Sequence, residues 1–277
     1  MKSVISIGNQ DFISIRKNNC FYIDKTDFIR EWWENQDSVT LITRPRRFGK
    51  TLNMSMTEYF FSVNYSDMGQ YFKELSIWKE ERFREIQGTY PVISLSFADI
   101  KATTYESARM SIIRKLVRLY SAFDFIRSSE ALNEKDRTYF DSVGEDMSDD
   151  ASAVGINYMS DYLSRYYGKK VIILLDEYDT PLQEAYVHGY WEELTAFIRS
   201  LFNSTFKTNP YMERGLLTGI TRVSKESIFS DLNNLEVVTT TSEKYSTSFG
   251  FTEEEVFTVL ENAGIPEEKE HVRYWYD

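Results

Sequence analysis

Five consecutive apolar residues at positions 171–175, followed directly by Asp176 and Glu177, constrain the fold of this chain more than any other feature. The run has no polar alternation, so it predicts a strand buried on both faces, as in a parallel sheet that helices cover on each side. Polar residues at the carboxyl end of such a strand lie where open α/β sheets bind ligands. We therefore expect an α/β protein with its ligand site at this edge of the sheet.

Strand and helix patterns alternate along the rest of the chain, which favours a mostly parallel five-stranded sheet with helices on both faces. The patterns predict further strands over residues 39–43, 91–97, 214–219 and 235–239, and helices over 24–33, 50–62, 107–120, 156–167 and 191–206. Thr252 and Glu255 form a capping box that predicts a last helix ending at Gly264. Residues 128–150 are polar and acidic, and we expect a surface excursion there.

Composition excludes several classes of protein. The 277 residues are 42% hydrophobic, yet no apolar run is long enough to span a bilayer and no signal peptide is visible. A single cysteine, Cys20, excludes a disulfide framework. These features predict a soluble, cytoplasmic protein without a membrane partner. The net charge of −11 argues against nucleic acid as a partner of this segment alone.

A basic loop follows the first predicted strand, and its end, Gly49-Lys50-Thr51, matches the end of the phosphate-binding pattern GxxxxGK[ST]. In such a loop, backbone amides at a helix N-terminus face phosphate oxygens. Lys50 would bridge the β- and γ-phosphates, and the Thr51 hydroxyl would coordinate Mg²⁺. Arg44 stands where the pattern has its first glycine, so the loop is either a tolerated variant or a degenerate site. The candidate nucleotide-binding residues are Arg46, Arg47, Phe48, Gly49, Lys50, Thr51 and Leu52.

Acidic and polar residues at two later strand ends complete the candidate site. Asp176 would hold Mg²⁺ together with Thr51, and Glu177 would polarise the water that attacks the γ-phosphate. Thr218, near the end of the fourth predicted strand, or Thr221 could sense the γ-phosphate, while Arg222 could reach the phosphates or a neighbouring subunit. Simple solvation of a strand end is the alternative for each. We therefore expect Glu177, Lys50, Thr218 and Arg222 to be the catalytic residues, with ATP and Mg²⁺ as cofactors.

Several long motifs resemble the AAA-ATPase-like family, whose members usually carry a PD-(D/E)xK nuclease domain after the ATPase. The resemblance covers nearly the whole chain, and its motifs lie at residues 22–26, 41–51, 174–181, 217–222, 225–230, 232–235 and 249–254. It implies a P-loop ATPase with the strand order 5-1-4-3-2, and Arg44 as a habit of the family rather than damage. It also implies that Asp24 and Lys25 lie near the base of the nucleotide.

Together, these observations predict a Mg²⁺-dependent ATPase that works as a motor or switch for an attached or partner effector. We expect residues 1–245 to form the P-loop ATPase domain and residues 246–277 to begin a truncated C-terminal helical region. The nuclease domain would then be absent from this chain, and a homo-oligomer would place Arg222 at a neighbour's site. The alternatives are a nucleotide-binding scaffold without efficient hydrolysis, or the regulatory part of a nucleic-acid-processing nuclease.

Overall fold

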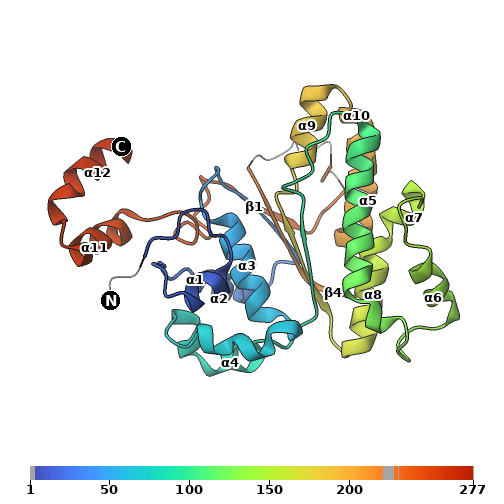
Figure 1. The fold of residues 1–277 in the computed structure, drawn as a ribbon, viewed down its shortest axis with the longest axis horizontal. Helices are drawn as coiled ribbons and strands as arrows, with labels where there is room; N and C mark the ends of the chain where they lie inside the picture. The colour runs from blue at the N-terminus through green and yellow to red at the C-terminus, as the bar shows by residue number, and fades with distance from the viewer. Residues whose placement is uncertain (1–3, 221–227, 230, 277) are drawn as a thin grey trace.

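A five-stranded, all-parallel sheet forms the centre of the protein (Figure 1). The computed structural model describes residues 4–220, 228–229 and 231–276. The strands are β1 (Val39–Thr43), β2 (Val92–Ser96), β3 (Val171–Asp176), β4 (Met212–Gly219) and β5 (Leu235–Val238). Their order across the sheet is β2-β3-β4-β1-β5, which from the opposite edge reads 5-1-4-3-2. All four neighbouring pairs are parallel, so the carboxyl ends of all five strands share one edge.

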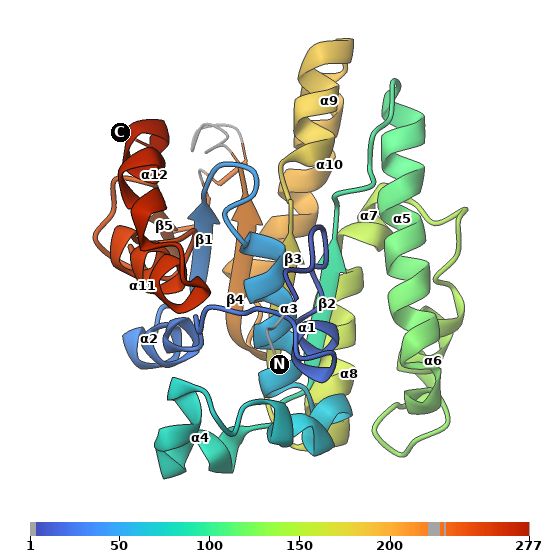
Figure 2. The ribbon, with the colours of Figure 1, turned by 60° about the vertical axis from the view of Figure 1, so that its left-hand side comes forward.

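Helices cover both faces of the sheet, which explains the unbroken apolar run in β3 (Figures 1 and 2). On β3, Ile172 and Leu174 pack in one hydrophobic core, whereas Ile173 and Leu175 pack in the other. The first core lies beneath α1 (Phe12–Lys17), α2 (Asp27–Asn35) and α3 (Lys50–Phe61). The second lies beneath α5 (Tyr105–Ala122), α8 (Gly155–Tyr167) and α10 (Trp191–Phe202).

The predicted helices form with small shifts of their ends. Gly168 is the C-cap residue of α8, and its φ of 64° places it in the left-handed region that glycine tolerates best. α10 is four residues shorter than predicted, because the chain continues from Phe202 as a π-helical turn over Asn203–Lys207. The remaining helices of the described residues are α4 (Glu81–Ile86), α6 (Glu134–Asp141), α7 (Asp149–Ala153), α9 (Thr180–His188), α11 (Glu253–Ala263) and α12 (Lys269–Tyr276). Short 3₁₀ turns lie at Val63–Tyr71, Ser76–Lys79, Asp124–Ile126 and Pro266–Glu268.

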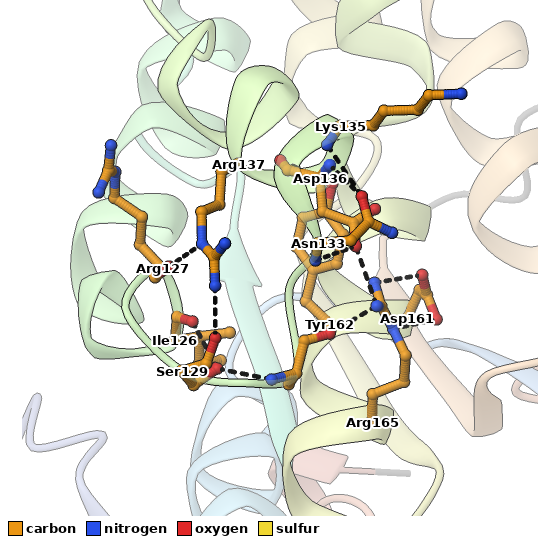
Figure 3. Close-up of polar contacts among 11 residues, drawn as sticks. Ile126, Arg127, Ser129, Asn133, Lys135, Asp136, Arg137, Asp161, Tyr162 and Arg165 are labelled. Carbon is orange, nitrogen blue, oxygen red and sulfur yellow. Dashed lines mark hydrogen bonds and ion pairs between the residues drawn. The ribbon is translucent and has the colours of Figure 1, made fainter.

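Residues 128–150 are more than the surface excursion that their composition predicts. They contain α6 and the start of α7, and they bury Leu132, Phe140 and Met147 in the core beneath α5 and α8. Figure 3 shows the ion pair that attaches this region to α8: Arg165 of α8 donates to Asp136 of α6 at 2.9 Å. Within α8, Arg165 also donates to Asp161 at 2.9 Å. Mean composition was misleading here, because a few apolar residues anchor a mostly charged segment.

The C-terminal helices are arranged differently from those on the sheet. In Figure 1, α11 and α12 stand apart from the sheet, beyond α1 and α2, and an extended orange-red segment joins them to it. No residue of α11 is buried. Among the helices of the described residues, none has the length and apolar character needed to cross a membrane.

Candidate functional site at the carboxyl edge of the sheet

The lysine-bearing loop connects the end of β1 to the start of α3, and it lies at the carboxyl edge of the sheet (Figure 2). Two residues in the loop have positive φ angles, Arg47 at 69° and Gly49 at 74°. Gly49 is the N-cap residue of α3, and no side chain accepts a hydrogen bond from the amides of the first turn. A helix N-terminus without a side-chain cap leaves its amides available to an anion.

The side chain of Lys50 lies within this loop. Its Nζ donates to the carbonyl oxygens of Arg44 at 2.8 Å and Pro45 at 2.9 Å, and the residue is 6% exposed. Burial lowers the pKa of the Lys50 amine, while the nearby carboxylates of Glu177 and Asp176 act in the opposite direction. The predicted lysine and the predicted acid pair therefore lie close enough to interact, although they are far apart in the sequence.

Asp176 joins three elements at the end of β3. Thr51, in the first turn of α3, donates from Oγ1 to Asp176 Oδ2 at 2.8 Å. Thr218, near the end of β4, donates from Oγ1 to Asp176 Oδ1. The Asp176 carboxylate is buried, and both donors hold it in a fixed orientation. The sequence pattern predicts Thr218 as a sensor of the γ-phosphate. In the structure, its hydroxyl contacts Asp176 and the residue is 1% exposed.

Glu177 follows β3 in a left-handed backbone conformation, with φ of 53°. Its amide donates to Thr218 Oγ1 at 3.3 Å, and its Oε2 accepts from Thr180 Oγ1 at 3.1 Å. A positive φ is unusual for glutamate, and such strain gathers at functional sites when the surroundings hold it. Next to it, buried Asp179 accepts from the Ile220 amide at 3.0 Å, which ties the start of α9 to the end of β4.

The side chain of Arg44 is directed toward β5 and Phe249, out of the phosphate-binding loop. Its φ is not in the left-handed region, so the missing first glycine imposes no backbone strain at this position. The guanidinium is buried and donates to the carbonyl oxygens of Thr43 at 3.1 Å and Val238 at 3.3 Å. It also lies 5.6 Å from the centre of the Phe249 ring. The sequence left two interpretations of Arg44 open, a tolerated variant of the phosphate-binding loop or a degenerate site. The backbone geometry favours the tolerated variant.

The other residues predicted to bind the nucleotide differ in their exposure to solvent. Arg46, Arg47 and Phe48 are exposed at the loop surface. The side chain of Leu52 is partly buried and packs against the core beneath α3. Thr221 and Arg222 lie outside the described residues.

Sequence reasoning missed a second layer of contacts around the loop. Asn53, one turn into α3, donates from Nδ2 to the carbonyl oxygen of Ser248 at 2.8 Å. Lys25, for which the family resemblance implies a place near the nucleotide base, donates from Nζ to both carboxylate oxygens of Glu255, at 2.6 and 2.8 Å. No local pattern in the sequence pointed to these contacts, because their partners lie about two hundred positions downstream.

The oxygens at the site suit a hard divalent cation shared with a phosphate. The described residues contain no group of three or more His, Cys, Asp and Glu side chains that could hold a metal by themselves. Thr51 and Asp176 supply a hydroxyl and a carboxylate whose oxygens lie 2.8 Å apart. Mg²⁺ is usually held by one or two protein oxygens, with substrate phosphates and water completing the shell, so this pair fits Mg²⁺.

The fold and the loop geometry define a parallel α/β protein in which the uncapped N-terminus of α3 lies beside the acidic end of β3. The sequence profile of the family described as "Predicted AAA-ATPase" matches residues 6–229, so the chain belongs to this family. One curated relative, "Uncharacterized protein in vnfD 5'region" from Azotobacter chroococcum mcd 1, is 26% identical over 280 residues. That alignment covers 99% of this chain and 48% of the relative, so the chain spans about half the relative's length. No solved structure gave a significant match.

Proposed function

We propose that the protein binds ATP with Mg²⁺ and hydrolyses it, acting as a motor or switch for an attached or partner effector. The observation that carries this proposal is the hydrogen bond from Thr51 to Asp176. It joins the first turn of α3, where phosphates would bind, to the acidic end of β3. Membership of a predicted ATPase family supports the same reaction.

Each residue has a role that follows from its contacts. The uncapped amides of α3 and the Lys50 ammonium would bind the β- and γ-phosphates, with Nζ leaving the carbonyls of Arg44 and Pro45. Thr51 and Asp176 would hold Mg²⁺, which would neutralise charge on the transferred phosphoryl group. Thr218 is a positioning residue in this scheme, because its hydroxyl orients the Asp176 carboxylate.

Glu177 is the general base in this proposal. Its carboxylate follows Asp176 directly and would accept a proton from the attacking water, while Thr180 orients it through the 3.1 Å hydrogen bond to Oε2. The hydroxyl of that water would form the new bond to phosphorus as ADP leaves. The strained φ of 53° turns Glu177 out of the line of β3 at the edge where the phosphates would lie.

A combined thermal-shift and phosphate-release assay tests the proposal, with ATP and GTP, each with and without Mg²⁺. Lys50→Ala should abolish the nucleotide-induced shift. Glu177→Gln should retain the shift while phosphate release falls about a hundredfold or more, as expected for the loss of a general base. Glu184→Gln is the matched control, because Glu184 lies on α9 beside His188 at 3.5 Å and should behave as wild type.

Three outcomes would change the proposal. Unchanged hydrolysis in Glu177→Gln would remove Glu177 from the role of base. A nucleotide-induced shift without phosphate release in the wild type would favour the scaffold alternative. The absence of any shift with either nucleotide would overturn nucleotide binding itself.

A further inference from the structure

The segment that joins β5 to α11 is attached directly to the phosphate-binding loop. We define residues 239–252 as the connecting segment. The Gly250 amide donates to the carbonyl oxygen of Phe48 at 3.0 Å, and Ser248 accepts the Asn53 hydrogen bond. A Cβ atom on Gly250 would lie 3.0 Å from the Phe48 ring, and the φ of Gly250 is 74°. The segment therefore approaches the loop as closely as a glycine allows.

The other end of this attachment is the first turn of α11. Lys25, just before α2, donates to the Thr247 carbonyl at 2.6 Å and to the Glu255 carboxylate. Glu255 also accepts from the Thr252 amide at 2.7 Å, completing the capping box of α11. A single carboxylate therefore both caps α11 and fixes the start of that helix to the core of the protein.

The core residues that make these contacts are buried, whereas the helix that they hold in place is not. Arg44, Asn53 and Lys25 are 3%, 4% and 8% exposed, so their polar groups depend on these partners. α11, by contrast, buries no residue of its own. The position of α11 therefore depends on the connecting segment and Lys25 more than on packing against the sheet.

We propose that nucleotide binding at the loop is coupled to the position and order of α11 through the connecting segment. This inference rests on the proposed function. Binding would draw Lys50 Nζ away from the carbonyls of Arg44 and Pro45, and the loop between Arg44 and Phe48 carries contacts to the connecting segment. Asn53 and Lys25 are positioning residues for this coupling, since neither reaches the phosphates in the proposed scheme. Coupling is reciprocal, so a change in α11 also alters nucleotide affinity.

Hydrogen–deuterium exchange of the full chain, with and without adenylyl imidodiphosphate and Mg²⁺, tests the coupling. In the wild type, the nucleotide should slow exchange in residues 44–53 and change exchange in residues 253–263 by about fivefold or more, the lower end of typical coupling. Glu255→Gln should largely lose the α11 response, because glutamine can still cap the helix but cannot pair with the Lys25 charge. Lys25→Met should lose it in the same way.

Glu253→Gln is the matched control. It removes an acid from the same turn of α11, but Glu253 pairs with Arg273 of α12 at 2.7 Å, so the α11 response should persist. Protection of residues 44–53 without any change in α11 would overturn the coupling and leave nucleotide binding intact. An undiminished α11 response in both Glu255→Gln and Lys25→Met would overturn the role of this ion pair. The absence of protection at residues 44–53 would overturn both the coupling and the proposed function.

Discussion

Helices α3 and α11 are stabilised in opposite ways. α3 starts at a left-handed glycine without a side-chain cap, yet seven of its twelve residues are buried against the sheet. α11 has a complete capping box and a glycine C-cap with φ of 77°, yet none of its eleven residues is buried. Tertiary packing therefore holds α3, whereas local hydrogen bonds, the ion pair with Lys25 and ion pairs with α12 hold α11. The helix without a cap is the one whose amides remain available for a ligand.

The loss in the free energy of unfolding should differ most between the two helices when one aromatic ring is removed from each. Phe60 on α3 is fully buried and its ring lies 5.3 Å from that of Phe72, so Phe60→Ala should lower the free energy of unfolding by about 3–5 kcal/mol. On α11, Phe257 is only partly covered, by Lys269 and Arg273, and Phe257→Ala should cost less than about 1 kcal/mol. Urea denaturation measures both, and equal losses would refute the contrast.

A second pair of variants compares hydroxyl groups at the two regions. Thr218→Val removes a buried donor to Asp176, and an under-satisfied buried carboxylate should cost about 1–3 kcal/mol. Thr258 lies on the exposed surface of α11, so Thr258→Val should change stability by less than about 0.5 kcal/mol. Thermal unfolding without nucleotide measures both. A neutral Thr218→Val would mean that Asp176 does not need this donor.

The third comparison removes a threonine N-cap from a packed helix and from an exposed one. Thr104 accepts from Ser107 at the start of α5, which buries six residues, so Thr104→Ala should lower global stability by about 1 kcal/mol. Thr252→Ala should remove about the same free energy from α11, but locally. Amide exchange in α11 should then quicken while the global unfolding midpoint stays unchanged. A fall in that midpoint would show that α11 unfolds together with the sheet.

The smallest effect concerns the pH dependence contributed by Lys50. Burial lowers its pKa in the folded protein, so the unfolded chain keeps this proton to higher pH than the folded chain does. Stability should therefore rise with pH, relative to Lys50→Met, from the lowered pKa up to about 10.4. Urea denaturation of both proteins across the alkaline range measures the difference. A difference that falls with pH would show that the carboxylates of Glu177 and Asp176 outweigh burial.

Much of the fold and part of the site could be predicted because their signals are local. The apolar run at 171–175 indicated burial on both faces, and the structure divides its residues between two cores. The loop at Gly49-Lys50-Thr51 follows β1, and the two acids lie at the end of β3. Parallel strands bring their carboxyl ends to one edge. The roles of Glu177 and Lys50 in catalysis stay predictions.

Other features escaped the sequence because they depend on what each side chain contacts. Arg44 looked like a defect in the phosphate-binding pattern, but its side chain turns toward Val238 and Phe249 and its backbone is not left-handed. Residues 128–150 looked like a solvated excursion, yet three apolar side chains among them enter the core.

The amino-acid sequence alone determined the alternation of strands and helices, the capping box of α11 and the lysine and acids of the site, since periodicity and short motifs act over a few residues. Only the tertiary structure decided that Lys25 and Asn53 would contact a segment about two hundred residues away. Such contacts form between buried polar groups that must find partners somewhere, and the partner is chosen by the packing of the whole chain.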